Sequence, residues 1–159
     1  MGKLSRNKGN AFERLISKMI IAAVNKGCKS KYAAKDCYRT PLSGGHPLAD
    51  PGDLTYSPAF AKVFPYHVEC KHHKSFSLEH FFRPTAALKS WCAQTIKGAK
   101  KSERRPMLVI RGARTPIFVG LTIEPIFGIE YIKIDLNVTW VFCRFDDFLK
   151  GQFSKCTNE

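Results

Sequence analysis

Residues 66–71 show a strict alternation that constrains the fold more than any other feature of the sequence. In an extended strand, successive side chains point to opposite faces. One face would carry Tyr66, Val68 and Cys70. The other face would carry His67, Glu69 and Lys71. The segment therefore predicts a β-strand that presents a carboxylate and an ammonium group together on one face.

Other periodic segments surround this strand. Apolar residues recur at spacings of three and four over residues 12–24, which predicts an amphipathic helix that stops at Gly27. A second helical stretch covers residues 76–97 and is interrupted at Pro84. We expect further strands at residues 53–56, 107–111, 117–121, 131–136 and 138–142, and a short final helix at 146–150. We expect loops or turns at residues 39–52, 57–65 and 98–105.

This order of elements predicts an α/β fold with a mixed central sheet flanked by helices. The length of 159 residues fits one domain, and we expect a single domain over residues 1–159. Apolar residues make up 44% of the chain, which is too many for a disordered protein.

The charge balance indicates what kind of partner the chain binds. Lys and Arg number 26 against 13 Asp and Glu, which gives a net charge of +13. Such an excess suits a polyanion, because each phosphate contact releases counterions. Nucleic acid is the interpretation we favour, while a membrane surface and a merely soluble basic protein remain alternatives.

Cysteine spacing and hydropathy further limit the class of protein that this chain can belong to. The six cysteines include no Cys-x-x-Cys pair, so we expect reduced thiols rather than disulfides or a structural zinc site. No apolar run is long enough for a transmembrane helix, and the N-terminal residues lack the apolar core of a signal peptide. We therefore expect a cytoplasmic protein, in the host cytoplasm if a phage encodes it, with no membrane partner and no small-molecule cofactor.

Three carboxylates stand in positions that suit chemistry. Asp53 opens a strand directly after Pro51 and Gly52, Glu69 lies in the middle of the next strand, and Glu13 lies near the start of the first helix. An Asp on one strand and a Glu on its neighbour can converge on a hard cation such as Mg²⁺ or Mn²⁺. Lys71 could then orient a water or neutralise charge on a phosphate. The alternative is a solvated Glu69–Lys71 pair on an exposed face.

These residues resemble a known superfamily. Gly52-Asp53 followed by Val68-Glu69-Cys70-Lys71 resembles the Asp, then Glu-x-Lys signature of restriction-endonuclease-like PD-(D/E)xK nucleases. The segment from Lys8 to Arg14 (KGNAFER) is similar to the Lys-Gly-x-x-x-Glu-Arg opening of Holliday-junction resolvases of the archaeal Hjc type and their bacteriophage relatives.

Two later segments fit the same group. They are the Arg39 to Gly45 segment before the Asp strand, and Trp91-x-x-Gln94 followed by Pro106 to Val109. The resemblance covers roughly residues 5–120, and Gly52 splits the literal Pro-Asp pair.

The resemblance implies a restriction-endonuclease-like fold and a homodimer that cuts four-way DNA junctions with Mg²⁺, for which Mn²⁺ would substitute. It implies that the metal is held by Asp53, Glu69, the Cys70 carbonyl and Glu13, while Lys71 positions the attacking water. It also implies DNA contacts from Arg14, from Arg39 and Ser43 on a loop near the scissile phosphate, and from Gln94 with a weaker match.

Basic residues outside these motifs complete the expected DNA surface. They are Arg6 and Lys8 at the start of the first helix, and His72, His73 and Lys74 after the predicted strand. Two other functions remain open. One is a nuclease of the same fold that acts on duplex, nicked or flap DNA, and the other is a non-catalytic basic DNA-binding protein.

Overall fold

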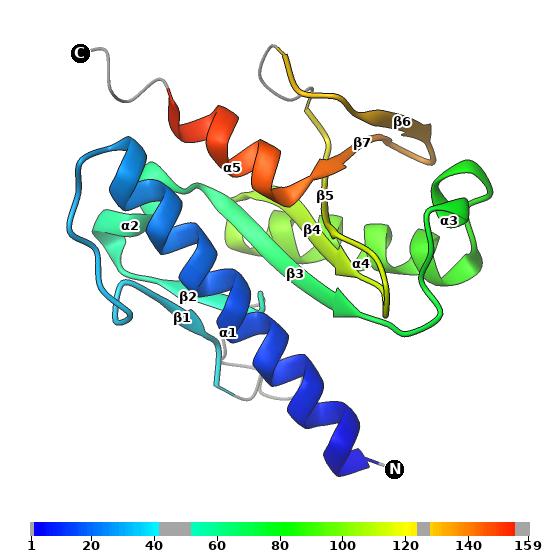
Figure 1. Ribbon diagram of the computed structural model, residues 1–159, viewed down its shortest axis with the longest axis horizontal. Coiled ribbons are helices and arrows are strands. Elements are labelled where there is room, and N and C mark those ends of the chain that lie inside the picture. The colour runs from blue at the N-terminus through cyan, green and yellow to red at the C-terminus, as the bar shows by residue number, and fades with distance from the viewer. Residues whose placement is uncertain (1, 42–51, 124–127, 155–159) are drawn as a thin grey trace.

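The computed structural model describes residues 2–41, 52–123 and 128–154, with the side chains of residues 2–7 outside that description. A five-stranded mixed sheet forms its centre (Figure 1). The strand order is β3 (Tyr66–His72), β4 (Arg105–Arg111), β5 (Ile117–Leu121), β7 (Thr139–Arg144) and β6 (Ile132–Asp135). Only β3 and β4 run parallel, and the other neighbours pair antiparallel. The predicted mixed sheet flanked by helices is confirmed.

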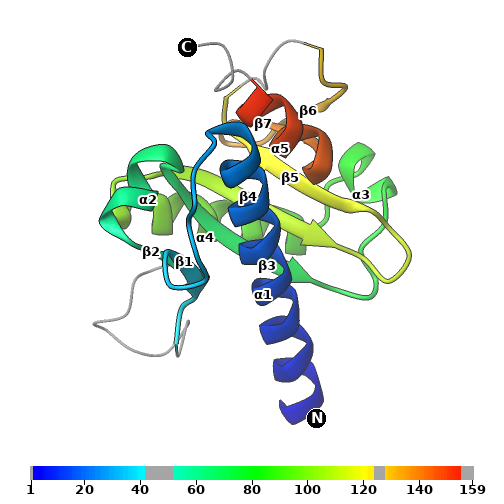
Figure 2. The same ribbon diagram turned by 60° about the vertical axis from the view of Figure 1, so that its left-hand side comes forward.

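Helices cover both faces of the sheet, as Figures 1 and 2 show. On one face lie α1 (Gly2–Gly27) and α5 (Phe145–Phe153), and on the other lie α3 (Glu79–Phe82) and α4 (Ala86–Ser102). Strand β4 divides its side chains between two cores. Met107 and Val109 pack into the core beneath α1 and α5, while Leu108 and Ile110 pack into the core beneath α4. Successive side chains of β4 therefore alternate between the two faces and are apolar on both, as a sheet covered by helices on both faces requires.

A small antiparallel ribbon lies beside the sheet and carries part of the site. It consists of β1 (Cys37–Arg39) and β2 (Leu54–Tyr56), with Cys37 opposite Tyr56. The backbone N–H of Asp53 donates to the carbonyl of Val68 at 3.0 Å, which ties the start of β2 to the outer edge of β3. The ribbon therefore places residues near position 53 against the middle of β3.

The sequence prediction of the elements needs three corrections. Helix α1 begins at Gly2 rather than at residue 12. The residues before position 12 are mostly polar, and such residues can form helical turns without an apolar face. Residues 57–65, predicted as a turn, contain α2 (Pro58–Val63). Ser57 caps this helix by accepting from the N–H of Phe60, and Pro58 occupies the first turn, where its missing N–H costs nothing.

The third correction concerns the basic turn predicted at residues 98–105. Helix α4 continues through Gly98 to Ser102 and ends where Glu103 adopts φ 53°. The break at Pro84 is confirmed, and Thr85 caps α4 by accepting from the N–H of Leu88. Gly98 does not stop the helix, because it lies against the buried His67 ring, where a Cβ would collide with the imidazole.

Two other expectations can be compared with the described residues. The five cysteines at positions 28, 37, 70, 92 and 143 carry thiols rather than disulfides. Within residues 2–41, 52–123 and 128–154, no helix is both long enough and apolar enough to cross a membrane.

Candidate active site

Asp53 is fixed against β3 by two hydrogen bonds. Besides the bond from its N–H to the Val68 carbonyl, its Oδ2 accepts from the backbone N–H of Cys70 at 2.7 Å. The N–H and C=O of one strand residue point to the same side of the strand. The Cys70 carbonyl is therefore directed to the same edge of β3 as the Asp53 carboxylate.

Glu69 lies at the centre of a three-residue hydrogen-bond cluster. This cluster lies on the face of β3 that points away from the core beneath α1 and α5. Its Oε1 accepts from Lys71 Nζ and from Gln94 Nε2, both at 2.7 Å. Lys71 Nζ also donates to Gln94 Oε1 at 3.1 Å, so the three side chains close a ring of contacts. Glu69 is only 5% exposed. The predicted shared face of Glu69 and Lys71 is confirmed, and Gln94 from α4 joins them.

Glu13 approaches the same region from α1. It is 8% exposed, and its Oε2 lies 2.7 Å from Arg39 Nε on β1. Arg39 was predicted to lie at the start of a loop near the DNA. The structure corrects that placement, because Arg39 is the last residue of strand β1 and pairs with Glu13. The β1–β2 pairing fixes the Arg39 backbone, and the buried Glu13 carboxylate attracts the Arg39 guanidinium.

The electrostatics show that the three carboxylates act on one another. Burial, followed by the charge of Asp53, raises the pKa of Glu13 to about 7, although Arg39 offsets part of the effect. Burial, and then Asp53, also raise the pKa of Glu69, with Lys71 opposing. Burial raises the pKa of the Cys70 thiol well above its usual value, and the charges of Asp53, Glu13 and Glu69 add to this. We call Glu13, Asp53 and Glu69 the acidic cluster.

Exposed basic side chains lie on the same two elements, α1 and β3 with the residues after it, that carry Glu13 and Glu69. Lys8 and Arg14 are exposed on α1, and His72 to Lys74 are exposed at the end of β3. The ring of His72 lies 5.5 Å from that of Phe12 on α1. Burial lowers the pKa of His72, and the nearby charges of Arg111 and Lys8 lower it further. Ser43 and the side chain of Arg6 lie outside the described residues.

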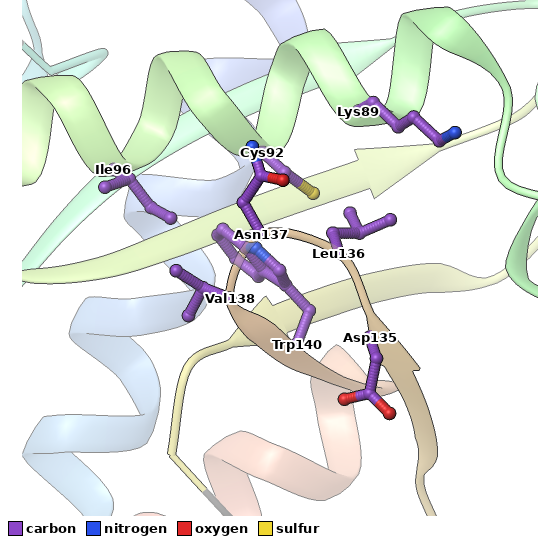
Figure 3. Close-up of a pocket in the computed structure, with 8 residues that line it drawn as sticks. All are labelled: Lys89, Cys92, Ile96, Asp135, Leu136, Asn137, Val138 and Trp140. Atoms are coloured by element: carbon purple, nitrogen blue, oxygen red, sulfur yellow. The ribbon is translucent and has the colours of Figure 1, made fainter.

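A pocket of about 210 Å³ lies elsewhere, between α4 and the β6–β7 hairpin (Figure 3). Its lining includes Lys89, Ile96 and Trp140. Helical geometry places Gln94 on the opposite flank of α4 from Lys89 and Ile96. The pocket is therefore separate from the acidic cluster.

Comparison with known proteins identifies the family of the chain. The model of the family described as "Phage putative PDDEXK endonuclease" matches residues 4–155. The chain belongs to this family. No curated protein and no solved structure matches the chain. Membership makes the protein a DNA endonuclease and therefore a hydrolase of phosphodiester bonds, and enzymes of the PD-(D/E)xK superfamily typically use a divalent metal ion.

The residues present fit such an ion. In the part of the chain that the structure describes, no three His, Cys, Asp or Glu side chains form a ready-made ligand group. Mg²⁺ does not need one, because it binds through one or two carboxylates, several waters and substrate phosphates. The acidic cluster supplies oxygen ligands, and the charge of Asp53 raises the pKa of both Glu13 and Glu69, which is negative charge that a cation would compensate.

The sequence predicted the residues of the acidic cluster but not the contacts that Arg39 and Gln94 make with them. The Glu13–Arg39 pair joins residues on different elements, and no local pattern indicates it. Gln94 was predicted to lie near the active site and to contact DNA, and in the structure its amide bonds Glu69 and Lys71. The only signal for Gln94 was its place three residues after Trp91, on a helix that had to pack against β3.

Proposed function

We propose that this protein is a Mg²⁺-dependent endonuclease that resolves four-way DNA junctions by paired, symmetric hydrolysis. The observation that carries the proposal is the convergence of Glu13, Asp53 and Glu69 next to Lys71, from three separate segments of the chain. The products would be 5′-phosphate and 3′-hydroxyl ends.

Each side chain has a role that its contacts support. Asp53, Glu69, Glu13 and the Cys70 carbonyl would hold Mg²⁺ or Mn²⁺. When bound, the ion would lower the pKa of a water ligand and polarise the phosphoryl oxygen. Lys71 directs two of its three N–H donors at Glu69 and Gln94. We assign the third donor to the attacking water.

The preference for junctions rests on the first helix and on symmetry. Lys8 to Arg14, which resembles the opening of junction resolvases, lies on α1 and includes Phe12, whose ring contacts His72 at the end of β3. The N-terminal end of α1 extends beyond the sheet (Figure 2). Lys8 and Arg14 would contact phosphates of DNA arms there, through shape and charge rather than base identity. Two symmetric cuts need two equivalent sites, which a two-fold homodimer provides.

Cleavage assays with matched variants test the catalytic part. We expect Asp53→Asn and Glu69→Gln to lose at least about a hundredfold in single-turnover rate, the scale for losing one group that stabilises the transition state. Glu103→Gln, which alters an exposed carboxylate at the end of α4, should keep the wild-type rate. Wild-type rates in either cluster variant, with Mg²⁺ present and the fold intact by circular dichroism, would show that the site is misassigned.

A second assay tests the substrate. A four-way junction, a linear duplex, a nicked duplex and a flap are compared at equal salt. Faster cleavage of the junction, with cuts at symmetric positions on opposing strands, is expected. Equal or faster cleavage of the other substrates would favour a general nuclease of this fold. Tight binding without cleavage in Mg²⁺ or Mn²⁺ would favour a non-catalytic DNA-binding protein.

A further inference from the structure

A half-exposed aromatic pair lies beside the catalytic Glu69–Lys71–Gln94 contacts. Trp91 on α4 faces His73, with ring centroids 5.7 Å apart and planes tilted by 52°. Trp91 comes three residues before Gln94, so the two are neighbours on the helix surface. His73 comes two residues after Lys71, at the end of β3. The pair therefore lies next to the Lys71 and Gln94 side chains, which contact Glu69.

The pair is held in a defined position. His73 Nδ1 lies 2.8 Å from Ser75 Oγ, and the His73 backbone N–H donates to the carbonyl of Arg111 at 3.0 Å. Part of the Trp91 indole packs against the core beneath α4, while the rest remains accessible. An aromatic surface that is already ordered loses little conformational entropy when a ligand stacks on it.

The exposure of Trp91 differs from that of the other tryptophan. Trp140 is 1% exposed in the core beneath α4, as expected for an indole that serves packing alone. Trp91 instead contacts exposed His73, which exposed Lys74 follows in the chain, so its accessible part lies near basic side chains and the Glu69–Lys71–Gln94 contacts. An aromatic face within a cationic surface is the combination that single-stranded nucleic acid recognises.

We propose that Trp91 and His73 form a stacking site for one unpaired nucleobase adjacent to the scissile phosphate. This inference rests on the proposed function and specifies which DNA the site prefers. In a continuous duplex each base is already stacked on both faces. A base at a branch point, flap or opened junction can leave the stack and rest on the indole, so the site selects branched DNA without reading sequence.

Trp91 fluorescence tests the stacking directly. The chain has two tryptophans, so Trp140→Phe leaves Trp91 as the only one. In an Asp53→Asn background that blocks cleavage, saturation with a flap or four-way junction should quench the Trp91 emission, because a base would stack on the indole. Saturation with a fully paired duplex, verified by anisotropy of labelled DNA, should leave the emission unchanged. Equal quenching by all three DNAs, or none, overturns the proposal.

Cleavage kinetics provide a test that does not depend on altering a core residue. Trp91→Leu should lower kcat/KM on the flap and junction about tenfold and leave cleavage of a nicked duplex, where bases stay stacked, within about twofold. Trp91→Phe should restore most of the loss. Phe82→Leu, which alters an aromatic residue that is 73% exposed on α3, should match wild type.

The outcomes separate this inference from the proposed function. If Trp91→Leu loses activity equally on every DNA, or on none, the stacking site is wrong while metal-dependent cleavage stands. If wild-type protein cleaves no DNA in Mg²⁺ or Mn²⁺, the proposed function fails first. A Phe82→Leu loss equal to that of Trp91→Leu would also overturn the assignment.

Discussion

Gln94 is the residue through which helix α4 reaches the acidic cluster. Its amide donates to Glu69 and accepts from Lys71, so it holds both members of the Glu69–Lys71 pair at once. We expect Gln94→Ala to slow single-turnover cleavage about tenfold or more, because hydrogen bonds to charged groups contribute about 1.5–3 kcal/mol. The DNA dissociation constant should change little.

The matched control for this prediction is Gln152→Ala on α5. It removes the other glutamine of the chain and should retain wild-type cleavage. Wild-type single-turnover rates for Gln94→Ala would contradict a positioning role, and a rise in the dissociation constant alone would identify Gln94 as a DNA contact instead.

Glu13 should make stability depend on pH. Its pKa is about 7 in the folded protein against 4.5 for the ordinary group, so the folded state holds the proton more tightly than the unfolded chain. This contribution is complete below pH 4.5 and is lost as the pH rises toward about 7. The difference corresponds to about 3 kcal/mol. Urea unfolding in EDTA should therefore show a falling free energy of unfolding across this range.

Replacing Glu13 tests the assignment. Glu13→Gln cannot titrate, so its free energy of unfolding should fall less than that of the wild type over the same pH range. Glu69, whose pKa is also raised, supplies the remaining dependence. Parallel curves for wild type and Glu13→Gln would show that another group is responsible.

At the scale of elements, helix α4 packs closely against strand β3 at Gly98. A Cβ on Gly98 would collide with the ring of His67, which is 1% exposed and has Gly52 on another side, so the ring has little room to move. We expect Gly98→Ala to destabilise the protein by about 1–2 kcal/mol, because overpacking outweighs the gain of about 1 kcal/mol from helix propensity.

Gly9→Ala is the matched helical control. Its Cβ would meet no atom closer than Glu13 Oε1 at 4.0 Å, so the propensity gain should appear as a small stabilisation. Urea unfolding of both variants measures the difference. Equal stability of Gly98→Ala and Gly9→Ala would mean that α4 shifts away from β3 without cost.

At the scale of the whole molecule, the net charge of +13 should dominate DNA binding. The dissociation constant should rise by about a thousandfold or more between about 50 and 200 mM salt if six or more phosphates are contacted. Lys8→Ala and Arg14→Ala should each lower the slope of log K against log salt by about one. Lys150→Ala on α5 should leave the slope unchanged. If Lys150→Ala lowers the slope as much as Lys8→Ala and Arg14→Ala do, DNA is attracted by the overall charge rather than by a defined surface.

Much of the fold could be predicted from local patterns. The alternation over residues 66–71 determined β3 and which of its side chains share a face, because side-chain direction in a strand depends on the backbone alone. The end of α1 at Gly27 and the break at Pro84 followed from the same local rules. Residues 98–102 were predicted wrongly because Gly98 weakens a helix locally, whereas packing against His67 decides that the helix continues.

The sequence by itself determined the charge, the motif order and the acidic residues that the site needs, since these depend on residue type and short spacing. Only the tertiary structure decided that Arg39 pairs with Glu13, that Gln94 bridges Glu69 and Lys71, and that Trp91 faces His73. Each of these contacts joins side chains of different elements. Their positions follow from how α1, α4 and the β1–β2 ribbon pack around β3, which no short stretch of sequence encodes.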